Sequence, residues 1–138
     1  MQVADIDSTD FCNQWWQFYV ALAFLSVIGH TGGMKVSERL LNTIIRQIVA
    51  LVAPRRIILF GSAARGDMKK NSDIDLMIVL SDGAAKKKSA RILYTALETE
   101  GVPFDIVPVT EEDLARHGDT PGLVYRSALR EGRVLYAA

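Results

Sequence analysis

The chain has 138 residues, enough for one domain with a hydrophobic core and too few for two domains of ordinary size. The 16 basic residues balance the 16 acidic ones and 49% of the chain is hydrophobic, which excludes a disordered tail and a strongly basic nucleic-acid-binding protein. Cys12 is the only cysteine, so an intramolecular disulfide and a multi-cysteine metal site are excluded, and we expect a cytoplasmic protein.

Residues 1–33 differ in charge from the rest of the chain. They include no Lys or Arg, whereas all 16 basic residues fall between 34 and 138. The apolar run at 18–28 is shorter than the roughly 20 residues of a membrane-spanning helix, and its acidic flank is unlike the basic start of a secretory signal. We therefore predict an N-terminal extension at 1–33, either helical or poorly ordered, and a functional domain at 34–138. Met34, directly after a Gly-Gly break, is an alternative first residue of that domain.

The first predicted elements of the domain are a helix and a strand. Leu, Ile and Val recur every three or four residues over 37–53, which predicts an amphipathic helix that begins at the N-cap Ser37 and ends before Pro54. The apolar, β-branched run that follows predicts a strand at 55–60, and a short helix is expected from the turn at Ser62.

Helices and strands continue to alternate to the end of the chain. Ile74–Leu80 is a continuous apolar run, typical of a strand buried on both faces. Apolar spacing predicts a helix at 86–100 with its lysines in a solvated turn and Tyr94 on the packed face. A strand at 104–109, a capped helix from Thr110, and a last helix at 121–130 before 133–136 complete the series. The pattern is that of an α/β domain.

The turn at 61–66 has the composition of a phosphate-binding loop. Gly61 allows the backbone to approach a phosphate closely, and Ser62 contributes a hydroxyl and an amide at the start of a helix. Arg65 either adds positive charge for the phosphates or pins the turn, and the sequence leaves these two readings open.

Three acidic residues are predicted to form a metal site. Side chains alternate along a strand, so Asp73 and Asp75 point to the same face about 7 Å apart, where they can share divalent cations. Two Mg²⁺ ions can activate an attacking oxygen and stabilise leaving pyrophosphate. Asp105 interrupts an apolar strand, where an unpaired buried charge would be costly unless a metal ion or a base used it.

These motifs carry a resemblance to a known family. Gly61-Ser62, ten intervening residues, and Asp73-x-Asp75 resemble the signature of the DNA polymerase beta-like nucleotidyltransferase superfamily. Together with the Asp105 strand and the ending at 128–136, they resemble the minimal nucleotidyltransferase (MNT) family over about residues 35–138. The resemblance implies a small mixed β-sheet flanked by helices, with ATP as substrate and Mg²⁺ as cofactor.

The resemblance also implies a role for each motif residue. Gly61 and Ser62 would hold the triphosphate, and Asp73 and Asp75 would bind both metal ions. Asp105 would complete the site and act as base toward the acceptor hydroxyl.

The implied function is transfer of AMP from ATP to a hydroxyl, with a tyrosine of a HEPN-domain toxin as acceptor and this chain as the antitoxin. Because no acceptor-binding domain is visible in the sequence, we expect a second chain, in a homo- or hetero-oligomer, to supply recognition. We expect no membrane partner and no direct contact with nucleic acid. Two alternatives stay open: a non-catalytic antitoxin that masks the toxin by contact, and a small-molecule nucleotidyltransferase.

Overall fold

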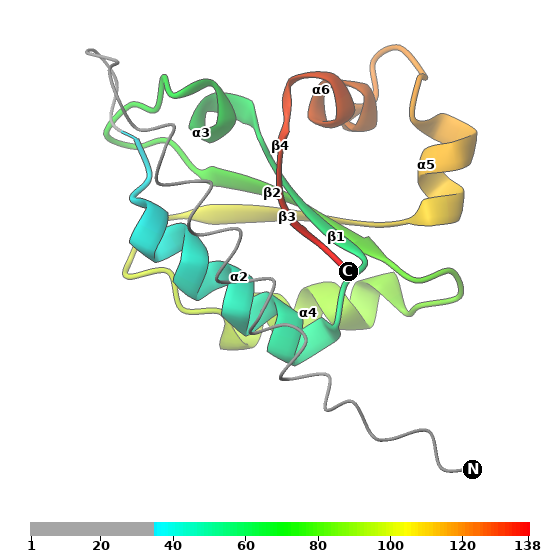
Figure 1. Cartoon of the computed structure of the whole chain (residues 1–138), viewed down its shortest axis with the longest axis horizontal. Coiled ribbons are helices and arrows are strands. Elements are labelled where there is room, and N and C mark those ends of the chain that lie inside the picture. Colours follow the sequence, from blue (N-terminus) through cyan, green and yellow to red (C-terminus); the bar gives the residue numbers. More distant parts are fainter. Residues whose placement is uncertain (1–34) are drawn as a thin grey trace, which may run out of the picture. The chain divides into compact units, whose positions relative to one another are not determined.

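The computed structural model describes residues 35–138, in which a four-stranded mixed sheet carries helices on both faces (Figure 1). The predictions for residues 1–34 lie outside the described residues. The elements in chain order are α2 (Glu38–Val52), β1 (Arg56–Phe60), α3 (Gly61–Arg65), β2 (Ile74–Leu80), α4 (Lys86–Ala96), β3 (Phe104–Thr110), α5 (Glu111–His117), α6 (Val124–Glu131) and β4 (Arg133–Ala137). The predicted fold class, a small mixed sheet flanked by helices, is confirmed.

The sheet has the strand order β3-β2-β1-β4. β1 pairs antiparallel with both β2 and β4, whereas β2 and β3 are parallel. Antiparallel pairing places the end of β1 beside the start of β2, and parallel pairing places the starts of β2 and β3 side by side. Three chain segments that are distant in sequence therefore meet at one end of the sheet.

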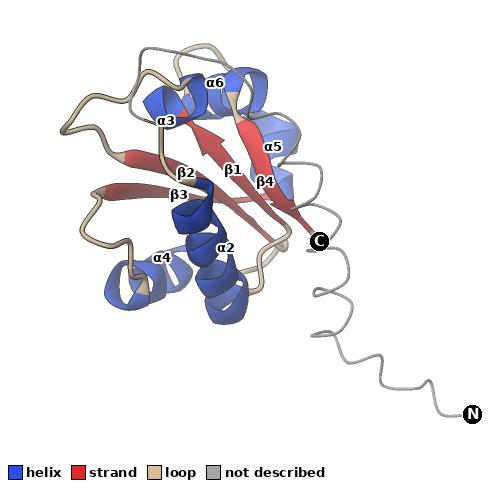
Figure 2. Ribbon diagram, turned by 60° about the vertical axis from the view of Figure 1, so that its left-hand side comes forward, coloured by secondary structure: helices blue, strands red, loops and turns tan. Residues whose placement is uncertain are grey.

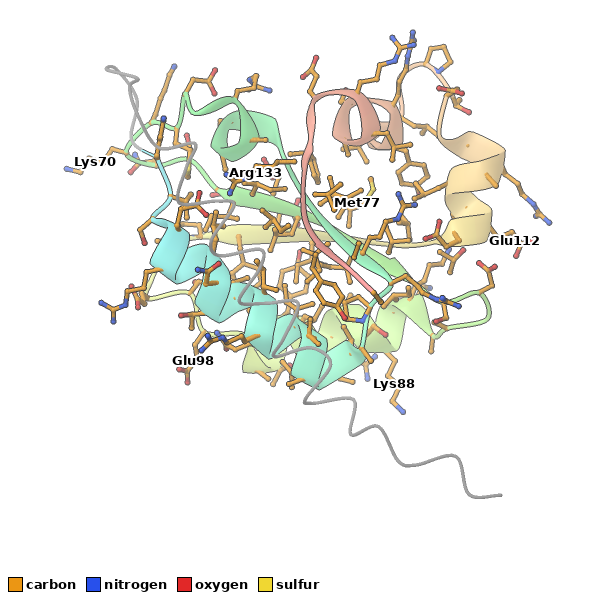
Figure 3. The ribbon with its side chains drawn as sticks, in the orientation of Figure 1. Lys70, Met77, Lys88, Glu98, Glu112 and Arg133 are labelled. Atoms are coloured by element: carbon orange, nitrogen blue, oxygen red, sulfur yellow. The ribbon has the colours of Figure 1, made fainter. Side chains whose placement is uncertain are left out.

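The helices form two layers, with α2 and α4 on one face of the sheet and α3, α5 and α6 on the other (Figures 1 and 2). β2 is buried on both faces, as its continuous apolar sequence predicts. Met77 lies between the sheet and α6 (Figure 3). It belongs to a buried cluster that joins the sheet to α5 and α6, made of Ile58, Phe60, Met77, Val79, Val109, Leu114 and Ala128.

α2 confirms the predicted first helix and its caps. The Ser37 hydroxyl accepts a hydrogen bond from the amide of Leu40 at 3.1 Å, which satisfies one of the free N–H groups of the first turn. The helix ends at Ala53, whose left-handed backbone (φ 43°) stops it directly before Pro54. No helix within residues 35–138 is long and apolar enough to cross a membrane.

α4 differs from its prediction at its C-terminal end. It begins at the predicted Lys86, with Lys87 and Lys88 exposed in its first turn, but it ends at Ala96 rather than near residue 100. The side-chain amide of Gln47 explains the early end. It accepts from the N–H of Glu98 at 2.8 Å and donates to the carbonyl of Glu98 at 2.9 Å, so neither backbone group of Glu98 is available to continue the helix.

α6 begins at Val124, three residues after the predicted start at Pro121. Pro121 has the fixed φ that suits a first helical position, but Gly122 adopts φ +85°, which no right-handed helix contains. The turn at 121–123 therefore delays the helix.

The start of α5 is tied to the start of α4. The predicted cap at Thr110 is present, and Thr110 and Asp113 form a capping box, in which each side chain accepts from the other residue's amide. Asp113 also accepts a hydrogen bond from the Lys86 ammonium at 2.7 Å. The Lys86 contact and the Thr110 amide lower the pKa of Asp113 below its ordinary value of 3.8, and the same contact raises the pKa of Lys86.

Replacing Asp113 should therefore destabilise the domain in a pH-dependent way. Asp113→Ala removes half of the capping box and should lower the free energy of unfolding by about 1 kcal/mol at neutral pH. Because the pKa of Asp113 is lowered by folding, its contribution is present above pH 3.8 and is lost as the pH falls below that value. Urea unfolding at several pH values measures the difference, with the exposed Asp119→Ala as control. Equal losses in the two variants would contradict the assignment.

Candidate active site

The predicted site residues gather at one end of the sheet. Phe60, the last residue of β1, pairs with Asp75 on β2, and Asp75 pairs with Asp105 on β3. Residues directly opposite each other in a sheet place their side chains on the same face, and neighbouring strands lie about 4.8 Å apart. The phosphate-loop sequence, which begins at Gly61, is thus next to both carboxylates.

Gly61 is packed against the carboxylate of Asp75. Its backbone has φ +69°, and a Cβ on this residue would lie 3.2 Å from Cγ of Asp75 and closer still to its Oδ2. Any larger residue would have to adopt an unfavourable backbone conformation and displace the carboxylate. The glycine of the loop and the second aspartate of the Asp-x-Asp motif therefore depend on each other.

Ser62 is the second residue of the short helix α3, which starts at the end of β1. The N-cap residue, Phe60, makes no side-chain hydrogen bond to the helix amides. The other end of the turn is closed by the Ser62 carbonyl, which accepts from the amides of Gly66 and Asp67. These features suit the predicted contact of the first amides with an anion.

Asp73 is exposed and lies directly before β2. A turn holds the loop in front of it: the Ser72 hydroxyl accepts from the Lys69 amide at 2.8 Å, and the Ser72 amide donates to the Lys69 carbonyl at 3.0 Å. Lys70, within this turn, points away from the domain (Figure 3). The Lys70 side chain is therefore exposed to solvent.

Negative charge is concentrated around Asp75. Burial is the largest cause that raises the pKa of its carboxyl above 3.8, and the nearby carboxylates of Asp105 and Asp73 raise it further. The charge of Arg65 acts in the opposite direction. The three predicted acidic residues are thus close enough to interact electrostatically, and a bound cation would relieve their repulsion.

Asp105 is not the unpaired buried charge that the sequence indicated. β3 is an edge strand, and Asp105 is exposed near its start. Its Oδ1 accepts a hydrogen bond from the Tyr94 hydroxyl at 2.6 Å and one from the amide of Ile106 at 3.0 Å. The argument from an unsatisfied buried charge was therefore wrong, although Asp105 does lie opposite Asp75.

Tyr94 is the residue of this region that sequence reasoning missed. It was predicted to pack on the apolar face of its helix, but its side chain is 49% exposed and its ring stacks on Phe104 with centroids 5.4 Å apart. Its hydroxyl accepts from the Ile106 amide at 2.9 Å while donating to Asp105. The available signal was a phenol near the end of a helix that leads into the Asp105 strand, because a tyrosine hydroxyl near a strand edge seeks a polar partner.

Arg65 has two acidic neighbours on the protein. Its Nε donates to Asp67 at 3.3 Å, and its Nη1 lies 3.9 Å from Oε2 of Glu131 on α6. These contacts favour the reading in which Arg65 pins the turn. Its influence on the pKa of Asp75 shows that its positive charge still reaches the site.

The donor chemistry of the site fits Mg²⁺ in combination with a nucleotide. Within residues 35–138, no three His, Cys, Asp or Glu side chains are grouped closely enough to hold a metal ion by themselves. Mg²⁺ is commonly bound by only one or two carboxylates together with substrate phosphates. Asp73 and Asp75 offer such carboxylates, and the crowded charge around Asp75 favours a cation.

Comparison with protein families decides what kind of domain this is. The model of the nucleotidyltransferase domain family matches residues 39–135, which span α2 to β4. The chain belongs to this family. The predicted nucleotidyltransferase assignment is confirmed, and the matched region of this nucleotidyltransferase domain contains all six predicted site residues.

Two solved structures are similar to the nucleotidyltransferase domain at low identity. One is a proposed nucleotidyltransferase from Sulfolobus solfataricus, with 19% identity and a TM-score of 0.44 over 76% of this chain and 93% of that one. The other is a mutant of the toxin–antitoxin pair MntA-HpeT, with 19% identity and a TM-score of 0.45 over 75% of each chain. At these values neither structure informs the activity of this chain. No curated protein matches it.

The contact between Gly61 and Asp75 can be tested with two glycine variants. Gly61 and Gly83 both have positive φ, but an added Cβ has no neighbour within 4 Å at Gly83. Each alanine variant should cost about 1–2 kcal/mol through backbone strain. Gly61→Ala should cost more than Gly83→Ala, because the Asp75 carboxylate must also move, and it should weaken nucleotide binding at least tenfold. Thermal unfolding and calorimetry with ATP measure the two effects. Equal losses of stability would contradict the close packing.

Removing the charge of Asp75 should stabilise the free protein. Because folding raises the pKa of Asp75, the ionised form opposes folding: stability is greatest below pH 3.8 and falls as the pH rises through the raised value. Asp75→Asn should therefore have a higher midpoint of thermal unfolding than the wild type at pH 7 without metal or nucleotide, and the difference should vanish below pH 3.8. The exposed Asp119→Asn should show no such change. A lower midpoint for Asp75→Asn at pH 7 would refute this reading.

Proposed function

We propose that this nucleotidyltransferase domain moves AMP from ATP to a hydroxyl of a partner protein, in a Mg²⁺-dependent reaction in the cytoplasm. The observation that carries the proposal is the register of β2, which pairs Asp75 with the residue before Gly61 on one side and with Asp105 on the other. A phosphate-binding turn and a carboxylate that can accept a proton thus flank the same Asp75. Family membership supports nucleotidyl transfer as the reaction.

Each residue of the proposed site has its own role in the reaction. The backbone at Gly61 and Ser62 binds the triphosphate, and Asp73 and Asp75 supply oxygen ligands for two Mg²⁺ ions. Bound Mg²⁺ supplies positive charge for the phosphates and the leaving group. Arg65 holds the turn and lends its charge to the same region.

Asp105 is proposed as the base. It takes the proton of the acceptor hydroxyl, whose oxygen forms a bond to the α-phosphorus while the bond from that phosphorus to the oxygen of the β-phosphate breaks and pyrophosphate leaves. Its exposure on an edge strand favours this role, because a hydroxyl of another molecule can reach it.

The proposed acceptor is a tyrosine of a HEPN-domain toxin, with this chain as the antitoxin. Support comes from the resemblance of the motifs at 61–66 and 72–76 to minimal nucleotidyltransferases. Asp105 is also exposed, so no side chain of residues 35–138 covers it against an incoming hydroxyl of a partner.

A second candidate is an antitoxin that masks its toxin by contact without catalysis. Two observations favour it. Asp105 already accepts a hydrogen bond from Tyr94, and within residues 35–138 no three His, Cys, Asp or Glu side chains lie close enough to hold a metal ion. In this case substitutions at Asp73 and Asp75 would leave neutralisation of the toxin intact. Transfer to a small molecule is the third outcome that the same experiment can detect.

The test is transfer of label from ATP. The chain is incubated with MgCl₂, the protein encoded by the neighbouring gene, and ATP labelled either at the α- or the γ-phosphate. Label from the α-position should appear on the partner and label from the γ-position should not, because pyrophosphate leaves. Asp73→Asn should reduce transfer at least about 100-fold, since it removes a metal ligand, and Asp119→Asn should transfer normally.

Each result has a distinct meaning. Undiminished transfer by Asp73→Asn would refute the site. Absence of label on the partner, with neutralisation unaffected by Asp73→Asn and Asp75→Asn, would establish the contact antitoxin instead. Label found only in a small-molecule fraction would replace the partner protein as acceptor.

A further inference from the structure

The contact between Tyr94 and Asp105 lies on the acceptor side of the proposed site. From the loop outward, the sheet end carries Gly61 after β1, Asp75 on β2 and Asp105 on β3. β3 is the last strand of the sheet, and α4 packs against it. Tyr94 reaches the open edge of β3 from α4, where its hydroxyl bonds to both Asp105 and the Ile106 amide.

Asp105 has a physical reason to need such a partner. It is exposed on an edge strand, so no strand limits its side chain on the outer side. The carboxylate of Asp75 interacts unfavourably with it, which favours rotation of Asp105 away from the site. The Tyr94 hydroxyl and the Ile106 amide, both on the open-edge side of β3, fix this rotation by binding Oδ1 there.

Both hydrogen bonds to the Asp105 carboxylate go to the same oxygen. Both donors, the phenol at 2.6 Å and the amide at 3.0 Å, bind Oδ1. A carboxylate has a second oxygen with its own lone pairs. Held in this way, Asp105 presents Oδ2 for a metal ion or for the proton of an acceptor hydroxyl.

The hydroxyl of Tyr94 is itself held from two sides. Its ring stacks on Phe104, the residue before Asp105, with an interplanar angle of 18°. The hydroxyl accepts from Ile106, the residue after Asp105. Tyr94 therefore contacts three consecutive residues of β3 with Asp105 in the middle, which fixes its position despite its exposure.

We propose that Tyr94 is a positioning residue that orients the Asp105 carboxylate toward the metal and acceptor side of the active site. The inference rests on the proposed function of Asp105 as base and on its predicted role as a third metal ligand beside Asp73 and Asp75. Hydrogen-bonding partners of ligating carboxylates typically change metal affinity by 10- to 100-fold when they are removed. Because Tyr94 is 49% exposed, an effect near the lower end, about tenfold, is expected.

Metal binding, rather than transfer, provides the test. The full chain is titrated with Mn²⁺ by calorimetry in the presence of a non-hydrolysable ATP analogue. Tyr94→Phe keeps the ring on Phe104 and removes only the hydroxyl, and it should raise the apparent Kd for Mn²⁺ about tenfold. Tyr125→Phe, which removes a phenol hydroxyl from α6, is the matched control and should bind as the wild type does. Circular dichroism confirms that the variants are folded.

A double-variant cycle separates positioning from general support of the fold. Asp105→Asn should weaken Mn²⁺ binding, and adding Tyr94→Phe to Asp105→Asn should cause no further loss, because the phenol acts only through that carboxylate. A Kd for Tyr94→Phe within twofold of the wild type would overturn the proposal, as would losses that multiply in the double variant.

The failure of this inference and the failure of the proposed function give different results. If Asp105→Asn weakens binding and Tyr94→Phe does not, only the role of Tyr94 is lost. If Asp105→Asn leaves binding unchanged, both the role of Asp105 in the site and the positioning by Tyr94 are overturned. If the metal results are as expected but no acceptor is labelled, the positioning role stands and the proposed reaction fails.

Discussion

The active-site end of the domain depends on the two different pairings of β2. Its antiparallel partner β1 ends where β2 begins, and its parallel partner β3 begins there too. A sheet with only one kind of pairing would separate the loop at Gly61 from Asp75 or Asp75 from Asp105 by the length of a strand. The mixed sheet therefore brings a phosphate-binding turn and carboxylates from two strands to one place without any long loop.

This convergence has an energetic cost that the surrounding fold offsets. Burial and then the neighbouring carboxylates of Asp105 and Asp73 raise the pKa of Asp75, and Gly61 fits beside Asp75 only because it lacks a side chain. Stability comes from elsewhere, above all from β2, whose apolar residues are buried on both faces of the sheet. Such a division between a stable core strand and a strained end is common at sites that bind charged ligands.

Local signals in the sequence predicted most of the fold. The N-cap at Ser37, the apolar run of β2 and the capped helix start at Thr110 each depend on neighbouring residues, and all three were predicted correctly. The late start of α6 has a local cause in Gly122, but two other errors came from distant contacts. The end of α4 is set by Gln47, which is 51 residues away from Glu98, and the exposure of Asp105 depends on β3 lying at the edge of the sheet.

In the candidate site, too, the features set by neighbouring residues were predictable and those set by distant contacts were not. The spacing of Gly61, Asp73 and Asp75 indicated the family, because these residues lie close together in the sequence and their chemistry is specific. The contact of Tyr94 with Asp105 was not predictable in the same way, since helical periodicity alone assigned Tyr94 to the core. Only the end of the helix and the position of β3 reveal that this phenol reaches the strand edge.

The contacts at the two ends of α4 have a mechanical consequence. Near its first residue, Lys86 binds Asp113, which follows the end of β3, and near its last turn Tyr94 binds Asp105 at the start of the same strand. The helix is thus held at its start to α5 and near its end to the first residues of β3. Sliding of α4 along β3 would break both contacts, so the position of this helix and that of the Asp105 side chain are linked.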